Sequence, residues 1–202
     1  MWRRDAVTGM QADAALWARA AQADDAAFAE IFDRHGDRVY RHARRLVAQQ
    51  ADAEDVTAMV FLEAWRSRTR VRVVDGSPLA WLLVTATNLS RNLERGRIRH
   101  ERALRQLRIE DAPDHAEHVA EEQGVTSRRA PVQSSFGQLS RRDQEILMLC
   151  VIEELPPREV AVLMRVPAGT VRTRLSRAKK RLREALEAGH PDVVSQWRGV
   201  QG

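Results

Sequence analysis

The chain has 202 residues and a formal net charge of +5, a length that fits one large domain or two small ones. It holds no apolar stretch near the roughly 20 residues that a membrane span needs, and its N-terminus lacks the apolar core of a signal peptide. We therefore expect a cytoplasmic protein with no membrane insertion. The single cysteine, Cys150, excludes a disulfide within the chain, and its apolar surroundings EILMLCVI predict a core residue and not a reactive thiol.

Charge is unevenly distributed along the chain. Residues 91–108 carry seven Arg and two Glu, whereas residues 110–122 carry six acidic residues and no Arg or Lys. This alternation indicates modules with different roles, and the basic modules favour a polyanionic partner.

The first half of the chain predicts helices, because glycine and proline are sparse and strand-like alternation is almost absent. After a disordered segment 1–11, a short helix runs over 13–23, and Asp24 or Asp25 caps the next helix. We expect Gly36 to interrupt that helix. A further helix starts near Asp52. Its inner stripe is expected to be Val56, Met59, Val60, Ala64 and Trp65.

A loop over 69–78 then precedes a long helix from Pro78 to about Leu107. Residues 109–135 are acidic and then polar, which predicts a flexible linker. Its two histidines, His115 and His118, lack a nearby cysteine, so we expect no metal site and no cofactor. The whole chain is thus predicted to be all-α, with two small helical domains over 12–108 and 136–186 and a tail over 187–202.

The second domain contains a predicted helix-turn-helix. Ser140 is a good N-cap for the helix that Pro156 and Pro157 end. A short helix over 157–164, a turn over 165–167 and a long amphipathic helix from Ala168 follow. The apolar stripe of the last helix leaves an outward set that can contact bases and phosphates in a major groove: Thr170, Arg172, Thr173, Arg174, Arg177 and Lys180. A merely solvated basic helix remains the simpler alternative.

These stretches carry a family resemblance. LSRRDQEILMLCVIEELPPREVAVLMRVPAGTVRTRLSRAKKRLREAL resembles region 4 of bacterial sigma factors of the extracytoplasmic-function group, in the sigma-70 family. FAEIFDRHGDRVYRHARRLV, DAEDVTAMVFLEAWRS and SPLAWLLVTATNLSRNLERGRIRH resemble successive parts of their region 2. Two independent sets of motifs in the right order make this likeness specific. One departure is Arg165, which stands in the turn where the family usually has glycine.

The resemblance implies a non-enzymatic subunit that directs RNA polymerase to promoters. Region 4 would bind the minus-thirty-five element as duplex, and region 2 would bind and melt the minus-ten element. The partners implied are core RNA polymerase, through its β′ clamp coiled coil and its β flap, promoter DNA and an inhibitory anti-sigma factor. The loop over 69–77 would receive an unstacked base, and a set on the following helix would contact the minus-ten element: Asn88, Arg91, Arg95, Arg97 and Arg99. The resemblance also implies a polymerase-binding set, namely Glu54, Asp55, Leu62 and Arg66.

Two other function classes stay open at this point. A stand-alone helix-turn-helix regulator, with a helical dimerisation or sensor domain, would bind duplex DNA without polymerase. A metal nuclease could use Glu54, Asp55 and Glu63, but the sequence offers no convergent His or Lys and no glycine-rich phosphate loop, so an enzyme is not expected.

Overall fold

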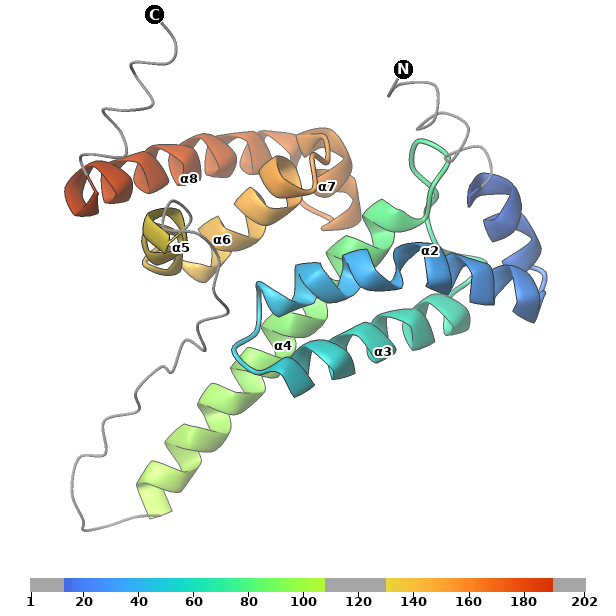
Figure 1. Ribbon diagram of the computed structural model, residues 1–202, viewed down its shortest axis with the longest axis horizontal. Helices are drawn as coiled ribbons and strands as arrows, with labels where there is room; N and C mark the ends of the chain where they lie inside the picture. Colours follow the sequence, from blue (N-terminus) through green and yellow to red (C-terminus); the bar gives the residue numbers. More distant parts are fainter. Residues whose placement is uncertain (1–12, 108–129, 191–202) are drawn as a thin grey trace, which may run out of the picture. The chain divides into compact units, whose positions relative to one another are not determined.

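The computed structural model describes residues 13–107 and 130–190. The chain divides into two compact units, Met1–His118 and Val119–Gly202, each with helices of its own (Figure 1). Within the described ranges there is no strand, only one isolated bridge between Val74 and Ser77. The predicted all-α class is confirmed. The expected disordered segment 1–11 and most of the expected linker lie outside the described residues.

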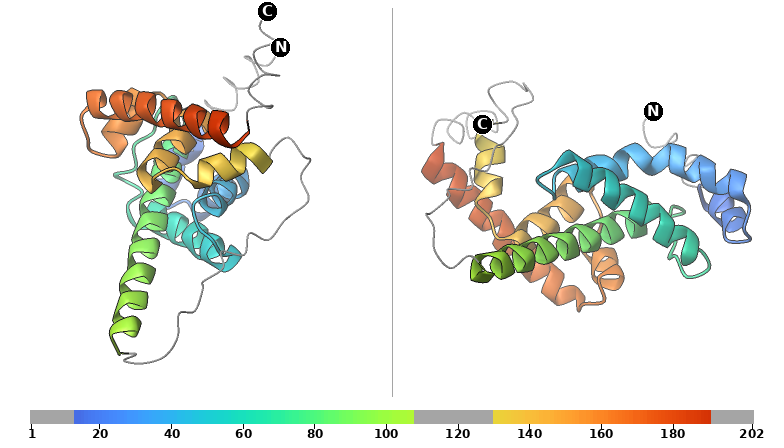
Figure 2. Two further views of the ribbon diagram at one scale, coloured as in Figure 1. Left: turned by 90° about the vertical axis from the view of Figure 1, so that its left-hand side faces the viewer. Right: turned by 90° about the horizontal axis from the view of Figure 1, so that it is seen from below.

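The first unit is built from a helical segment over 13–20 and three longer helices. These are α2 (Asp25–Arg44), α3 (Gln50–Arg66) and α4 (Leu79–Leu107). Asp24 caps α2, because its side chain accepts a hydrogen bond from the amide of Ala27 at 3.0 Å. The helices α2, α3 and the first half of α4 pack together, and the second half of α4 runs on past them (Figure 2). The shared core includes Trp17, Ile31, Val39, Val56, Val60 and Leu82.

The predicted interruption at Gly36 is wrong, because α2 is continuous from Asp25 to Arg44. Glycine in a helix interior costs about 1 kcal/mol relative to alanine, which packing against the core can offset. Gly36 is buried, and the ring of Phe32 one turn earlier covers it. Packing therefore decides this position over local propensity.

The inner stripe of α3 also differs from the prediction at one residue. Val56, Val60 and Ala64 are buried as expected, but Met59 is 49% exposed. The large side chain that enters the core is Phe61, whose ring lies 4.7 Å from that of Phe32 and 6.3 Å from that of Phe28. The buried face follows the spacing of Val56, Val60, Phe61 and Ala64, which leaves Met59 beside the stripe.

The loop before α4 contains a tight hairpin turn. Val74 and Ser77 exchange two backbone hydrogen bonds, each of 3.0 Å. The two residues between them, Asp75 and Gly76, have φ values of 48° and 79°. Positive φ at both central positions defines the type I′ turn, for which Asp-Gly is a preferred pair. The predicted loop is thus present, and its last part has a defined conformation.

The second unit contains α5 (Ala130–Gly137), α6 (Arg141–Leu147), the π-helical turn η1 (Met148–Ile152), α7 (Pro157–Leu163) and α8 (Ala168–Gly189). The predicted cap is confirmed, because the Ser140 hydroxyl accepts a hydrogen bond from the amide of Asp143. Residues 130–135, expected to be part of the linker, are helical instead. They lie in α5, which packs against α8 through a core that includes Phe136, Leu147, Leu175 and Ala178.

Candidate functional site

The turn between α7 and α8 sets the orientation of the two helices, and it is a complete Schellman motif. The Arg165 amide donates to the Val162 carbonyl at 3.2 Å, and the Val166 amide donates to the Ala161 carbonyl at 2.9 Å. Arg165 has a φ of 56°, in the left-handed region that favours glycine. The departure from the family pattern therefore leaves the hydrogen bonds of the turn intact.

The first half of α8 presents polar side chains outward. Thr170, Arg172, Thr173, Arg177 and Lys180 are exposed, and Arg174 is partly buried. On the opposite side, Val171 and Ala178 are buried against the rest of the unit. A solvent-open hollow gathers part of the predicted set, lined by Asp143, Gly169, Thr170, Thr173, Arg174, Arg177 and Arg181. Arg172 and Lys180 lie outside the lining of this hollow.

Arg181, in the same hollow, holds α8 to the start of α6. Its Nη1 lies 2.6 Å from the Oδ2 of Asp143, whose carboxylate is buried and also accepts a hydrogen bond of 2.8 Å from the Ser140 hydroxyl. A buried carboxylate needs such partners, because desolvating an unpaired charge costs several kcal/mol. The sequence indicated only the cap formed by Ser140, since Arg181 lies 38 residues after Asp143.

On α4, four of the five predicted minus-ten residues share one face. Asn88, Arg91, Arg95 and Arg99 follow one another at intervals of three or four residues, which places them in one row along the helix. Asn88 and Arg91 are partly buried near the core, and Arg95 and Arg99 are exposed on the half of α4 that runs beyond it.

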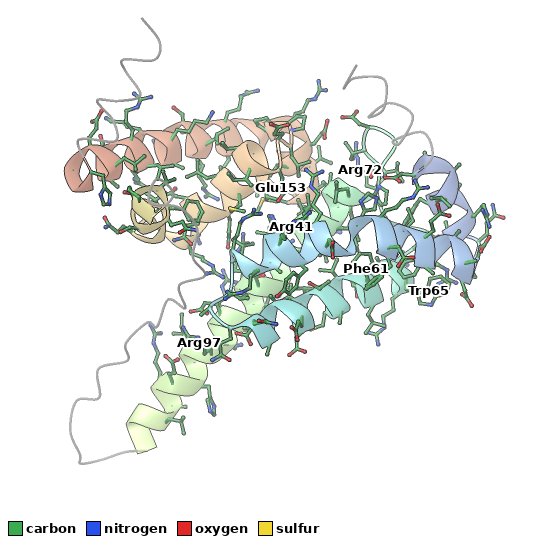
Figure 3. The ribbon with its side chains drawn as sticks, viewed as in Figure 1. Arg41, Phe61, Trp65, Arg72, Arg97 and Glu153 are labelled. Carbon is green, nitrogen blue, oxygen red and sulfur yellow. The ribbon has the colours of Figure 1, made fainter. Side chains whose placement is uncertain are left out.

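Arg97 lies off that row. Its guanidinium pairs with Glu94 and Glu101, each at 2.9 Å, and the hydrogen bond with Glu94 raises the pKa of Arg97 above its usual value. Figure 3 shows this side chain on the second half of α4. The structure therefore separates Arg97 from the other four, because it lies on the opposite side of α4 from their row and pairs with Glu94 and Glu101.

The exposed side of α3 carries the predicted polymerase-binding set. Asp55, Leu62 and Arg66 share one row, and Glu54 flanks it with a hydrogen bond from Gln50 of 2.8 Å. Met59, predicted to be inside, lies in the same row and adds apolar surface beside Leu62, which is 47% exposed. Phe32 of α2 is 45% exposed and contacts α3 through Phe61. The sequence did not reveal these last two contributions, because the packing of α2 and α3 decides which large apolar side chains stay exposed. Adjoining exposed apolar side chains are a sign of a binding face.

Comparison with known proteins identifies the family of the chain. Residues 31–103 match the family Sigma-70 region 2, and residues 129–182 match Sigma-70, region 4. The ECF RNA polymerase sigma factor SigE of Mycolicibacterium smegmatis is 32% identical over 170 residues, which cover 83% of this chain and 64% of that protein. The chain belongs to the extracytoplasmic-function sigma factors of the sigma-70 family.

One further relative and two solved structures are also similar to the chain. The ECF sigma factor SigK of Mycobacterium sp. strain KMS is 27% identical over 184 residues, or 85% of this chain and 89% of that protein. The solved structure of CnrH in complex with the cytosolic domain of CnrY matches with a TM-score of 0.61 and 25% identity, over 88% of this chain and 98% of that one. The sigma factor RpoE of Bartonella quintana, solved with the anti-sigma factor NepR, has the same TM-score at 21% identity, over 79% and 96%. This last likeness shows the fold alone.

The family matches fit the helices of this sigma factor. The region 2 match spans most of α2, all of α3, the hairpin loop and most of α4, and the region 4 match spans α5 to the middle of α8. Among the residues that the structure describes, no group of three His, Cys, Asp or Glu side chains could hold a metal ion, and no helix is long and apolar enough to cross a membrane. Burial raises the pKa of the Cys150 thiol to about 11, so little reactive thiolate exists near neutral pH.

Proposed function

We propose that this sigma factor binds core RNA polymerase in the cytoplasm, directs it to specific promoters and melts the minus-ten element. The observation that carries the proposal is the presence of both sigma-70 regions in one chain, each with an exposed polar face on a well-packed helix. Sigma factors are transcription initiation factors, and we assign the chain no enzymatic activity.

Recognition of the minus-thirty-five element belongs to α8 in this proposal. Thr170, Thr173, Arg174 and Arg177 line one hollow, and Arg172 and Lys180 lie outside its lining. Arginine can donate two hydrogen bonds to the O6 and N7 atoms of guanine, and threonine can contact a thymine methyl group or a phosphate. The Schellman turn at Arg165 and the ion pair between Arg181 and Asp143 support this role, because they fix the angle at which α8 is presented.

In this proposal, the minus-ten element binds to the row of residues on α4 and to the loop over 69–77 that precedes the helix. Asn88 offers an amide to a base edge, and Arg91, Arg95 and Arg99 would follow the phosphates of the non-template strand. Arg97 is the weakest member of the predicted set, because Glu94 and Glu101 compete with phosphate for its charge.

The row on α3 is the surface that we assign to the β′ clamp coiled coil of the polymerase. Asp55, Leu62 and Arg66, with Glu54 beside them, combine charge with exposed apolar surface, as protein interfaces do. Region 4 would contact the β flap. An anti-sigma factor is the inhibitory partner that we would expect to compete for these surfaces.

The test is a gel-shift assay on genomic promoter fragments with and without core RNA polymerase, followed by run-off transcription. We expect weak binding by the chain alone and strong, salt-sensitive binding with polymerase, since each neutralised phosphate releases counterions. Tight binding of duplex DNA by the chain alone, with no transcript on addition of polymerase, would instead identify a stand-alone regulator.

A further inference from the structure

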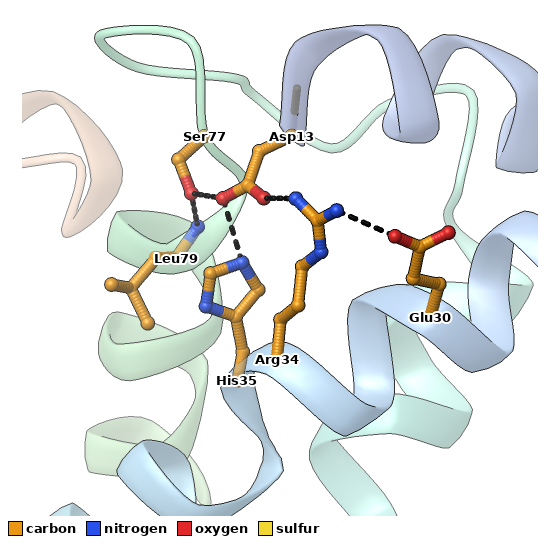
Figure 4. Close-up of polar contacts among 6 residues, drawn as sticks. All are labelled: Asp13, Glu30, Arg34, His35, Ser77 and Leu79. Atoms are coloured by element: carbon orange, nitrogen blue, oxygen red, sulfur yellow. Dashed lines mark hydrogen bonds and ion pairs between the residues drawn. The ribbon is translucent and has the colours of Figure 1, made fainter. Parts of the chain in front are cut away.

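The carboxylate of Asp13 lies inside the first unit, where it joins segments that are far apart in the sequence (Figure 4). Its helical segment buries Leu16, Trp17 and Ala20 one and two turns later, so Asp13 lies on the face that packs inward. The residue is 6% exposed. A carboxylate in this position must be hydrogen-bonded, because an unpaired buried charge is strongly destabilising.

Three side chains donate hydrogen bonds to the carboxylate of Asp13. Arg34 Nη1 lies 3.0 Å from Oδ1, and His35 Nε2 and Ser77 Oγ each lie 2.8 Å from Oδ2. Since an ionised carboxylate only accepts, the proton of His35 is on Nε2. Burial lowers the pKa of His35 against the attraction of Asp13, which favours the neutral imidazole.

Ser77 connects this carboxylate to the loop and to α4 at once. Its backbone closes the type I′ turn with Val74, and its hydroxyl accepts a hydrogen bond of 3.3 Å from the amide of Leu79, the first residue of α4. A hydroxyl has one proton, which Ser77 donates to Asp13, so these two bonds fix the orientation of the side chain.

The rest of the loop has few anchors of this kind. Arg72 and Val73 are exposed, with Val73 at 37%, whereas Val71 is buried against the core. Arg72 is seen in Figure 3 in the loop that leads to α4. The exposed part of the loop is thus held between buried Val71 at one end and Ser77 at the other.

We propose that Asp13 is a positioning residue for the loop over 69–77, holding that loop through Ser77 in the conformation that receives an unstacked base of the minus-ten element. This rests on the role that the proposed function gives to the loop. Asp13 would then control the melting step without contacting DNA, because it lies inside the unit.

The first test compares loss of the hydrogen bond between Ser77 and Asp13 with loss of the other contacts of Asp13. Ser77→Ala removes the link and leaves Asp13 paired with Arg34 and His35. Asp13→Asn weakens all three contacts. Arg34→Gln, the matched control, weakens the same carboxylate's contacts on the side away from the loop. In the holoenzyme we expect Ser77→Ala and Asp13→Asn to slow open-complex formation on a duplex promoter about tenfold, the effect of losing a hydrogen bond to a charged group.

A promoter whose minus-ten element is already unpaired shows whether the substitutions act on melting. A variant that merely destabilises the fold would be slow on the duplex and the pre-melted template alike. On this pre-melted template, Ser77→Ala should form open complexes at the wild-type rate. Arg34→Gln should form them at the wild-type rate on both templates. Ser77→Thr, which keeps the hydroxyl, should restore the wild-type rate on the duplex promoter. In the free chain, hydrogen exchange at the Val74 and Ser77 amides should be faster in Ser77→Ala than in Arg34→Gln. Equal slowing on both templates, or normal opening despite faster exchange, would overturn the inference.

A loop variant separates this inference from the function assigned to the loop. Arg72→Ala combined with Val73→Ala alters the exposed residues directly and leaves Ser77 in place. If this variant slows duplex opening and Ser77→Ala does not, the positioning role of Asp13 is refuted while the role of the loop stands. If neither has an effect, both the inference and the role of the loop are refuted.

Discussion

Arg165 occupies a backbone position whose conformation its side chain does not favour. Its φ of 56° places Cβ close to the following carbonyl, a contact that glycine lacks. The turn persists because the Schellman bonds of Arg165 and Val166 satisfy carbonyls at the end of α7, and because Val160 and Val171 are buried on either side of it.

Replacing Arg165 with glycine should therefore stabilise the second unit. Relief of the backbone strain exceeds the extra entropy that glycine adds to the unfolded chain, so we expect a gain of about 0.5–1 kcal/mol. Native-state hydrogen exchange of the buried amides in α6 to α8 would measure it in the full chain. Met164→Gly is the matched control: its φ of −80° is ordinary, so glycine there should lower stability. A loss of stability in Arg165→Gly would show that its side chain makes a compensating interaction.

Local sequence could predict only part of what individual residues do. The Ser140 cap was predictable, because capping depends on residues within one turn. The pairing of Asp143 with Arg181 and that of Asp13 with Ser77 were not, since the partners are 38 and 64 residues apart and meet only through tertiary packing.

At the level of helices, periodicity predicted most of the fold, and the errors at Gly36 and Met59 have a common cause. Gly36 and Met59 both lie at the boundary between the buried and exposed faces of their helices. There, helix packing decides burial: Phe32 covers Gly36, and Phe61 takes the core position expected for Met59. The same periodicity correctly placed the outward residues of α8 except Arg174, which is partly buried, because the buried stripe of Val171 and Ala178 is unambiguous.

The row on α4 gives a prediction that distinguishes neighbouring arginines. Arg95→Ala should weaken binding of the holoenzyme to promoter DNA and reduce the slope of log affinity against log salt by about one, as expected for one lost phosphate contact. Arg97→Ala should have a smaller effect, because its charge is shared with Glu94 and Glu101. Filter binding over a salt series would measure both slopes. Equal slopes for the two variants would mean that Arg97 leaves its acidic partners to bind phosphate.

At the scale of the whole molecule, each unit has its own core. The first is built around Ile31, Val56 and Leu82, and the second around Leu147 and Ala178 with Leu175. A surface substitution in one unit should therefore change neither the fold of the other unit nor the binding of that unit to its partner, since distant sites without shared contacts behave additively.

Two charge substitutions test this independence, together with the proposal that α3 binds polymerase and α8 binds the minus-thirty-five element. Asp55→Arg reverses an exposed charge on α3 and should prevent assembly with core polymerase, while the chain keeps its helical circular dichroism. Arg177→Ala, on α8, should assemble normally but bind promoters with a minus-thirty-five element less tightly, by about 1–3 kcal/mol if Arg177 contacts a guanine.

Native gels with core polymerase and promoter binding by the assembled holoenzyme read out the two effects separately. Arg142→Ala, which removes the same charge from the exposed surface of α6, is a control for charge alone and should change neither. If Arg177→Ala also impaired assembly, α8 would be part of the polymerase interface. If Asp55→Arg assembled normally, the row on α3 would not be the surface that seats this sigma factor on the polymerase, and the exposed Met59 and Phe32 beside it would need another partner.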